Sequence, residues 1–383
     1  MPDVTVVGGG PAGTLSARLL ASSGRDVTLI EDHHVSGTPV HCAGVVSGEV
    51  IENMGVKPEV EGIISAAEVV LPDSTSIFTR RRSPYAYVID RSDFDVKLAD
   101  AAEAAGVTMK YGIRYKNHQV TESGVTINTN SGSINSDLLV GADGQSSLVA
   151  ASLGNNAARS YIRGAQADVE YRMDNQECMR LWLGRDVAPG FFAWMLPLGD
   201  KTRIGLGVGL EYGPPIEYLN RLLDKTGLAE RRRLATYVGK IPIGGRRVSY
   251  ADRTLLIGDA AGQVKPVSGG GLYPISKVAP LLNETINRAY SMNMFTSSAL
   301  ALYERSWKRE IGKSINGGMR LRKYFDMLTD EELCQIGHLY AREDISELLS
   351  EIDVDDPSNV VRPILRCKGV KSTLLKIYLR HLL

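Results

Sequence analysis

Apolar and small residues follow a regular order over the first thirty positions. The run DVTVV (3–7) has the length and the β-branched content of a short buried strand. It leads into GGGPAG (8–13) and then into the Ala- and Leu-rich stretch TLSARLLASSG (14–24), which is typical of a helix. A second apolar run, DVTLI (26–30), follows. The pattern therefore predicts a strand, a tight glycine turn, a helix and a second strand.

Further apolar runs predict strands in the rest of the chain. SDLLVGADGQSS (136–147) and RTLLIGDAAGQVKPVSGGGLYPI (253–275) each contain a strand that ends near a glycine and an aspartate. The run AAEVVLPD (66–73) and the region 163–215, which includes FFAWMLPLGDKTRIGLGVGL, carry aromatic and β-branched residues between glycine turns. We expect these two regions to form an antiparallel sheet.

Three glycines in the first turn have the spacing of a dinucleotide-binding site. Gly8, Gly10 and Gly13 form G-x-G-x-x-G between the predicted strand and helix. The first glycine permits the turn, the second lets the backbone approach a pyrophosphate, and the third lets helix and strand pack closely. The N-terminus of the helix then offers free N–H groups to the phosphates. Glu31, which ends the second strand, is placed to bind both hydroxyls of an adenosine ribose.

These motifs are spread along the chain, so the nucleotide-binding domain must be assembled from separated pieces. We expect an α/β fold with a discontinuous Rossmann-like domain, an inserted antiparallel-sheet domain that holds substrate, and a C-terminal helical region. The nucleotide-binding domain is expected to comprise residues 1–64, 91–155 and 250–312. The substrate-binding domain is expected to comprise residues 65–90 and 156–249, and the helical region residues 313–383.

The C-terminal region changes sharply in charge. Residues 329–356 are strongly acidic, whereas residues 361–383 carry six Lys or Arg side chains and no acidic one. Apolar side chains in the basic segment fall at helical spacing on one face. They are Leu374, Leu375, Tyr378, Leu379 and Leu382. This pattern fits either a terminal helix docked on the body of the protein or an interfacial helix that rests on anionic lipid.

Composition narrows the class of protein. Hydrophobic residues make up 43% of the 383 positions, and 44 Lys and Arg balance 44 Asp and Glu, which argues against a disordered chain or a general nucleic-acid binder. The four cysteines lie far apart, without the spacing of a zinc site, so we expect no metal and a reducing cytoplasmic location. No apolar run reaches the roughly 18 residues of a membrane span, so any membrane contact is expected to be peripheral, at the cytoplasmic face.

With these motifs in place, the sequence resembles the flavoprotein hydroxylase superfamily. Its members carry the glycine fingerprint, an Asp-Gly motif and a Gly-Asp motif in this order, as Asp143 with Gly144 and Gly258 with Asp259 do here. The resemblance implies flavin adenine dinucleotide (FAD) as the cofactor. A carboxylate just after a strand, as at Asp259, can accept a hydrogen bond from a ribityl hydroxyl. The glycine-rich segment 269–272 can open a helix whose N–H groups face the flavin pyrimidine ring.

The positions expected to bind FAD are those of the three motifs and the segments beside them. Arg91 matches a superfamily arginine that lies near the cofactor. The full set is Gly8, Gly10, Pro11, Ala12, Gly13, Glu31, Cys42, Ala43, Gly44, Arg91, Tyr115, Asp143, Gly144, Gly258, Asp259, Pro266, Gly269, Gly270, Gly271 and Leu272.

Within this superfamily the chain resembles the geranylgeranyl reductases, in particular the archaeal enzymes that saturate the isoprenoid chains of ether lipids. The resemblance rests on PVHCAG (39–44), on KPVSGGGL (265–272) and on FAWMLP (192–197), followed by Gly205 and Gly207. The family pattern Tyr-x-Trp-x-Phe-Pro is matched at Trp194 and Pro197, but has phenylalanine at position 192 and leucine at 196 here. These changes keep an apolar wall and remove a hydroxyl.

The family resemblance implies an FAD-dependent reductase that saturates isolated C=C bonds of geranylgeranyl chains. Such an alkene needs hydride from flavin N5 and a proton on the neighbouring carbon, and Cys42 and His41 are the candidate donors. The prenyl chain is expected to lie in an apolar tunnel formed by Phe192, Trp194, Pro197, Gly205 and Gly207. Lys265 is expected either near the pyrimidine ring or in solvent.

Two other functions remain open from the sequence. An FAD-dependent monooxygenase would share most of the motifs, although a thiol beside the flavin would be prone to oxidation. A prenyl-binding escort protein without redox chemistry is the alternative from another class, and the intact phosphate cradle argues against it. A reductase also needs an external electron donor, which can be NAD(P)H, a ferredoxin or another reductant, because no second nucleotide fingerprint is present.

Overall fold

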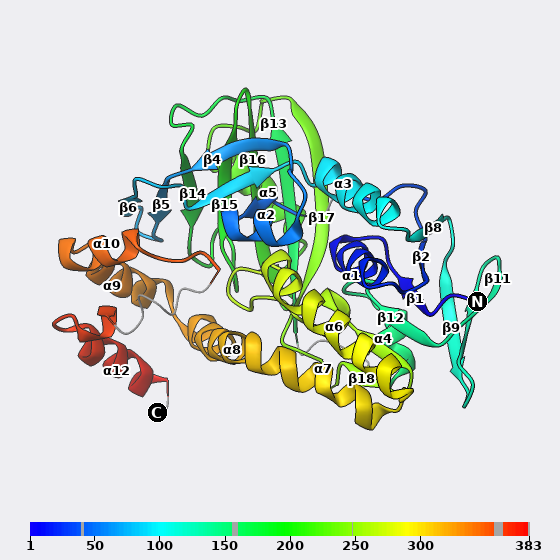
Figure 1. Cartoon of the computed structure of the whole chain (residues 1–383). Helices are drawn as coiled ribbons and strands as arrows, with labels where there is room; N and C mark the ends of the chain where they lie inside the picture. The colour runs from blue at the N-terminus through cyan, green and yellow to red at the C-terminus, as the bar shows by residue number, and fades with distance from the viewer. Residues whose placement is uncertain (40–41, 155–159, 247, 356–362, 382–383) are drawn as a thin grey trace.

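Figure 1 shows a mixed α/β molecule that contains two large sheets and helices packed against them. The computed structural model describes residues 1–39, 42–154, 160–246, 248–355 and 363–381. The first sheet carries the glycine motif, the second forms a separate green layer, and the C-terminal helices, drawn orange and red, lie at the far side. The α/β class with a largely antiparallel second sheet and a helical C-terminal region is as the sequence predicts, but the strand at residues 66–70 pairs with that at residues 178–182 in parallel.

The first sheet has six strands, of which five are parallel. Their order is β18 (Tyr250–Ala251), β19 (Thr254–Leu256), β12 (Leu138–Gly141), β1 (Val4–Val7), β2 (Val27–Glu31) and β8 (Thr108–Tyr111). The strand that precedes Asp143, β12, therefore lies beside β1, and the strand that precedes Asp259, β19, lies beside β12. As parallel strands present their carboxyl ends at one edge, the three sequence motifs meet there.

Helices and a small sheet cover the two faces of this sheet. The helices that pack on one face are α1 (Pro11–Ser22), α3 (Arg91–Ala104) and α6 (Leu272–Met292), with Leu15, Leu98 and Leu282 in a shared core. The other face packs against the hairpins β9 (Tyr115–Val120), β10 (Val125–Thr129) and β11 (Gly132–Ser136) and against α4 (Leu148–Ser152).

The second sheet has seven strands. Their order is β17 (Arg233–Ile243), β13 (Ser160–Val169), β16 (Lys201–Gly209), β15 (Ala193–Leu198), β14 (Cys178–Trp182), β5 (Ala66–Val70) and β6 (Ser76–Arg80). Alternate residues along each strand point to opposite faces. One face packs on α5 (Pro215–Lys225) through an apolar core that includes Ala167, Ile204 and Leu219. The other face is free to line a site.

A three-stranded sheet links the two large sheets. It consists of β3 (Val45–Val46), β7 (Ala86–Ile89) and β4 (Val60–Ile64), and it is preceded in the chain by the 42–44 segment. Helix α2 (Gly48–Met54) follows β3, and its N-cap Ser47 accepts a hydrogen bond from Val50 N. This sheet brings residues 42–44 to the boundary between the nucleotide-binding sheet and the seven-stranded sheet.

Helices α7 (Ser297–Glu310), α8 (Gly312–Met327), α9 (Asp330–Tyr340), α10 (Glu343–Ser350) and α12 (Val370–Arg380) form the C-terminal region. Figure 1 shows α9 and α10 beside β5 and β6, at the edge of the seven-stranded sheet. Within the described residues, none of the helices combines the length and the apolar character needed to cross a membrane.

Candidate active site

A large, mostly apolar cavity extends from the nucleotide-binding sheet to the C-terminal helices. Its volume is about 1730 Å³, well above the roughly 300–1,000 Å³ of most small-molecule pockets. Gly10 and Arg91 line one end, the cavity face of the seven-stranded sheet lines the middle, and Tyr340 and Leu375 line the other end. A cavity of this size and shape has room for a dinucleotide and a long apolar ligand together.

The glycine motif forms the phosphate end of the cavity. Gly8 has φ +111°, and a Cβ on Gly13 would lie 1.9 Å from the carbonyl oxygen of Gly8, so only glycine lets α1 pack on the end of β1. A Cβ on Gly10 would meet no described atom within 4 Å, and Gly10 lines the cavity with Pro11 and Ala12. This open backbone beside a helix N-terminus fits a pyrophosphate.

Glu31 lies at the end of β2, directly beside the glycine turn. Its Oε2 accepts a hydrogen bond from Gly9 N at 2.6 Å, and its Oε1 accepts one from His33 N at 3.0 Å. His33 Nδ1 also lies 2.5 Å from Oε1, so Oε2 is the oxygen that keeps a second lone pair for a ligand. The position next to the phosphate cradle is consistent with the predicted contact to a ribose.

Asp259 follows β19 and faces the cavity, where no described residue forms a hydrogen bond or ion pair with its carboxylate. Burial raises the pKa of the Asp259 carboxyl to about 6, although the positive charge of Arg91 opposes this rise. A Cβ on Gly271 would lie 3.1 Å from Asp259 Oδ1, and α6 begins at Leu272 without a side-chain cap. The Asp259 carboxylate and the N-terminus of α6 thus lie close together. The carboxylate suits a ribityl hydroxyl, and the helix N-terminus suits the pyrimidine ring of a flavin.

Asp259→Asn is expected to stabilise the cofactor-free protein in a pH-dependent way. The pKa of the Asp259 carboxyl is higher in the folded than in the unfolded protein. Ionisation of this buried group therefore lowers the stability of the folded protein as the pH rises from about 4 to about 6. The amide avoids this loss, and we expect a gain of ~1–2 kcal/mol in the free energy of unfolding at pH 7.5 and none at pH 4. Urea unfolding of FAD-stripped protein at both pH values measures it, and an equal gain at both would contradict the explanation. The same variant should bind FAD more weakly.

The Cys42 segment is held from the seven-stranded sheet. Gln166 Nε2, on β13, donates to the carbonyl oxygen of Cys42 at 2.9 Å, and Arg203 Nη1, on β16, donates to that of Ala43 at 3.0 Å. Gly44 has φ +81°, and a Cβ there would lie 2.4 Å from Ile89 O. Cys42 and Ala43 both line the cavity. The small residues of this segment therefore allow a tight turn that presents the thiol to the site.

Arg91, at the start of α3, lies beside this thiol. Its guanidinium forms an ion pair with Asp95, with 2.9 Å between Nη2 and Oδ2. Burial alone would lower the pKa of Arg91, but Asp95 and the Cys42 sulfur more than offset this and raise it above its ordinary value. Arg91 therefore stays charged in the cavity, where it is placed to attract an anionic group or a thiolate.

A buried ion pair supports the segment from behind. Arg203 Nε and Nη2 donate to Asp168 Oδ1 and Oδ2 at 2.7 and 2.9 Å, and the two side chains are 6% and 5% exposed. Burial lowers the pKa of Arg203, but the hydrogen bond and charge of Asp168 raise it overall. A bidentate pair of this kind fixes the plane of the Arg203 guanidinium. It thereby orients Nη1 toward the carbonyl oxygen of Ala43, to which Arg203 donates its third hydrogen bond.

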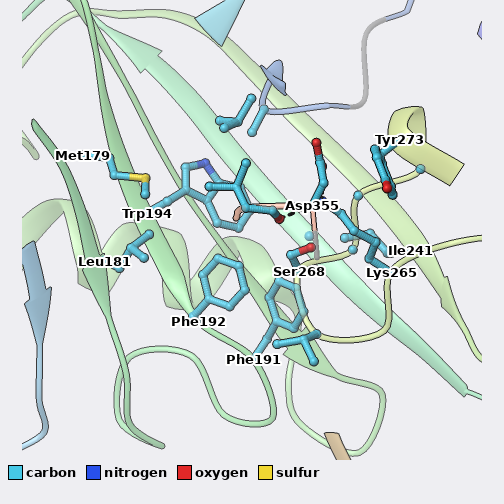
Figure 2. Close-up of a pocket in the computed structure, with 18 of the residues that line it drawn as sticks. Met179, Leu181, Phe191, Phe192, Trp194, Ile241, Lys265, Ser268, Tyr273 and Asp355 are labelled. Atoms are coloured by element: carbon cyan, nitrogen blue, oxygen red, sulfur yellow. Dashed lines mark hydrogen bonds and ion pairs between the residues drawn. The ribbon is translucent and has the colours of Figure 1, made fainter. Parts of the chain in front are cut away.

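The aromatic wall of the cavity comes from β15 and the loop before it. Figure 2 shows Phe191, Phe192 and Trp194 on one side, near Leu181 and Met179. A Cβ on Gly205 would lie 2.7 Å from Trp194 Cε2, and one on Gly207 would lie 2.5 Å from Phe191 Cδ1. These two glycines thus leave space for the rings. Pro197 does not line the cavity. Its carbonyl oxygen instead lies against Gly62 on the neighbouring strand β4.

Lys265 is neither free in solvent nor without a partner. Its Nζ forms an ion pair with Asp355 Oδ1 at 2.6 Å and donates to Val354 O at 3.0 Å. Figure 2 shows Lys265, Tyr273 and Asp355 opposite the aromatic wall. Residues 352–355 therefore join the C-terminal region to the glycine-rich loop and close one side of the cavity.

Several predicted site residues are not brought to the cavity. Tyr115 is buried against the β9–β11 hairpins, and its hydroxyl lies 2.7 Å from His118 Nδ1. Asp143 accepts hydrogen bonds from Ser147 Oγ and Val149 N at the start of α4, whereas Gly144 does line the cavity. Gly258 and Pro266 lie beside the lining, and His41 lies outside the described residues.

Sequence reasoning missed the residues that hold the site from a distance. Gln166, Asp168 and Arg203 lie on the cavity face of adjacent strands, but single polar residues in a β-strand carry no local motif. It also missed the wall that α9 and α12 contribute, including Leu374, Leu375 and Tyr378. For these three, the helical spacing of apolar residues was the available signal.

Comparison with known proteins identifies the cofactor. The profile of the FAD binding domain family matches residues 1–233. The halogenase PltM in complex with FAD has a TM-score of 0.71 over 98% of this chain and 85% of that chain, at 14% identity. A geranylgeranyl bacteriochlorophyll reductase-like protein from Thermoplasma acidophilum has a TM-score of 0.86 over 98% of this chain and 99% of that chain, at 21% identity. These structures share the fold, and the cofactor is FAD.

Two curated relatives match nearly the whole chain. The digeranylgeranylglycerophospholipid reductase of Methanocaldococcus jannaschii is 30% identical, over 92% of this chain and 92% of its own length. The digeranylgeranylglycerophospholipid reductase 2 of Methanothermobacter thermautotrophicus is 31% identical, over 95% of this chain and 99% of its own length. The FAD cradle, the thiol segment and these relatives agree, and the chain belongs to the digeranylgeranylglycerophospholipid reductase family of FAD-binding proteins.

Proposed function

We propose that this protein is an FAD-dependent reductase that saturates C=C bonds in the geranylgeranyl chains of archaeal-type membrane lipids. The observation that carries the proposal is the continuity of the cavity. It joins the FAD cradle at Gly10 and Asp259 to a long apolar wall that ends at the C-terminal helices. An extended prenyl chain with no polar groups needs such a lining, because each buried CH₂ contributes roughly 0.8 kcal/mol to binding.

The chain's own residues position the reaction and supply a proton. Bound FAD, once reduced by an external donor, supplies the hydride. The phosphate cradle and Asp259 hold the cofactor, and Phe192 and Trp194 hold the alkene against it. An isolated alkene gives no stable anion, so a proton must reach the neighbouring carbon as hydride arrives. Cys42 is the cavity-lining acid placed for this step, with Arg91 beside it to stabilise the thiolate. The apolar wall excludes bulk water.

Anaerobic lipid reduction tests the function. The purified yellow protein is reduced with dithionite and mixed with digeranylgeranylglyceryl phospholipid, and the lipid is analysed by mass spectrometry. We expect products that are heavier by two hydrogens or multiples of two. A gain of sixteen mass units in air without anaerobic saturation would instead identify a monooxygenase. A protein that binds the lipid without carrying a flavin would be an escort protein.

We further propose that α12 rests on an anionic membrane surface and admits the lipid. Leu375 and Tyr378 are 57% and 44% exposed, and both line the cavity. Lys371 and Lys376, on the same helix, are exposed basic side chains. Large apolar groups beside basic ones at the rim of a lipid-sized cavity fit the interface of a bilayer.

Leu375→Asp combined with Tyr378→Asp is expected to weaken vesicle binding. Loss of two apolar contacts and gain of two negative charges should lower the affinity for anionic phospholipid vesicles about ten-fold or more. Vesicle co-sedimentation measures this. The control is Val120→Asp, which changes an equally exposed apolar residue on β9, and it should bind as the wild type does. Equal binding by the double variant would remove α12 as the contact.

A further inference from the structure

Two buried polar atoms on the apolar wall have no partner in the described part of the chain. They are Oε1 of Gln166 and Nε1 of Trp194. Gln166 is only 4% exposed, and both residues line the cavity. An unpaired acceptor and an unpaired donor are both unfavourable in an apolar setting. The prenyl chain has no group that can pair with either atom.

The register of the seven-stranded sheet places these two side chains together. Trp194 on β15 and Gln166 on β13 are both opposite Gly205, on the intervening strand β16. A Cβ on Gly205 would lie 2.5 Å from Gln166 Cβ and 2.7 Å from Trp194 Cε2, the ring atom bonded to Nε1. Because Gly205 has no side chain, the amide and the indole approach each other across it. The sheet therefore presents one acceptor and one donor side by side in a wall that is otherwise apolar.

The orientation of the Gln166 amide is set by the Cys42 segment. Its Nε2 donates to the carbonyl oxygen of Cys42, so the opposite orientation would place two oxygen atoms against each other. Oε1 is consequently the free end of the amide. The polar pair thus lies in the same part of the cavity as the residue that carries the thiol.

We propose that Gln166 Oε1 and Trp194 Nε1 bind one water molecule that returns a proton to Cys42, with Gln166 as a positioning residue. A water molecule fits because it donates to one atom and accepts from the other. This inference rests on the proposed reductase function. Bound, reduced FAD would supply the hydride to one alkene carbon, and the Cys42 S–H bond breaks as the neighbouring carbon gains its proton. The thiolate then takes a proton from the water, and the hydroxide that this leaves takes up a proton from solvent. Two electrons leave the flavin and reduce the alkene.

Three variants separate positioning from simple folding. Gln166→Leu removes both functions of the amide, and Trp194→Phe removes the indole N–H and part of the ring while it keeps an aromatic residue in the wall. Each should lower the single-turnover rate of lipid saturation about ten-fold or more with unchanged FAD content, and Gln166→Leu should also leave KM unchanged. Gln119→Leu, an exposed change on β9, is the matched control and should behave as the wild type.

Gln166→Glu provides a rescue that depends on pH. A protonated carboxyl can donate to Cys42 O and accept from water, whereas the ionised form cannot donate and repels that carbonyl. Its activity should therefore approach the wild-type rate at low pH and fall as the pH rises through the carboxyl pKa, which burial raises. The Gln166→Leu variant should show no such recovery. Wild-type rates for Gln166→Leu and Trp194→Phe, or a Gln166→Glu profile that follows the wild type, would overturn the proposal.

Thiol reactivity provides a readout that does not depend on turnover. Iodoacetamide labelling of the Cys42 peptide, followed by mass spectrometry of the FAD-bound protein, should be at least about three-fold faster in Gln166→Leu, since the segment that holds the thiol is released. Unchanged labelling would mean that Gln166 does not position Cys42. If wild-type protein reduces no prenyl lipid, the proposed function fails, while labelling still decides the positioning role. If the wild type reduces the lipid and Gln166→Leu and Trp194→Phe reduce it equally fast, the proposed reductase function stands and only the inference about the bound water is overturned.

Discussion

Cys42→Ser is expected to keep its FAD and to lose most of its alkene reduction. The change preserves the small side chain and the tight turn around Gly44, so the flavin spectrum should match that of the wild type. A serine hydroxyl is a much weaker acid than a thiol. Since a positioned general acid contributes roughly 10²–10⁴-fold, the single-turnover rate of saturation should fall about 100-fold. Anaerobic flavin reoxidation by the lipid measures it.

The control for this variant is Cys334→Ser. Cys334 is half-buried on α9 and does not line the cavity, so its substitution tests the general effect of losing a thiol. Activity should be retained. Full activity in Cys42→Ser would assign Cys42 a packing role against the flavin and leave the proton donor to another group.

Asp168→Ala is expected to cause the largest loss of stability among the changes considered. It leaves the Arg203 guanidinium buried, with Glu61 at 3.7 Å as its remaining acidic neighbour. Removal of one partner from a buried ion pair costs about 3–5 kcal/mol. The free energy of unfolding in urea should fall by that amount. The Ala43 hydrogen bond should weaken as well, because the guanidinium loses its fixed plane.

The double variant Asp168→Leu with Arg203→Leu separates stability from site geometry. Apolar residues of similar volume can replace a buried ion pair with little loss, so much of the stability should return. The hydrogen bond to Ala43 should not return, and lipid saturation should stay low. A double variant with both normal stability and normal activity would show that the ion pair does not hold the Cys42 segment.

The α/β fold, the FAD cradle and the thiol segment follow from short contiguous motifs. Gly8, Gly10 and Gly13 predict the phosphate end because their conformational freedom acts within one turn. Asp259 could be placed at a strand end because the apolar run directly before it predicts a strand. The predicted FAD contacts of Tyr115 and Asp143 rested on resemblance alone. Both side chains form hydrogen bonds within the protein, and neither lines the cavity.

The residues that hold the thiol segment and close the cavity depended on tertiary structure. Gln166 and Arg203 are more than 120 residues from the segment that they hold, and Asp355 is 90 residues from Lys265. Local sequence patterns determine strands, helices and turns, because those depend on neighbouring residues. Strand register and the docking of α12 depend instead on which distant surfaces bury one another. For this reason HCAG in the sequence predicts a thiol beside a flavin, whereas only the fold shows the residues that hold this segment and the apolar wall near it.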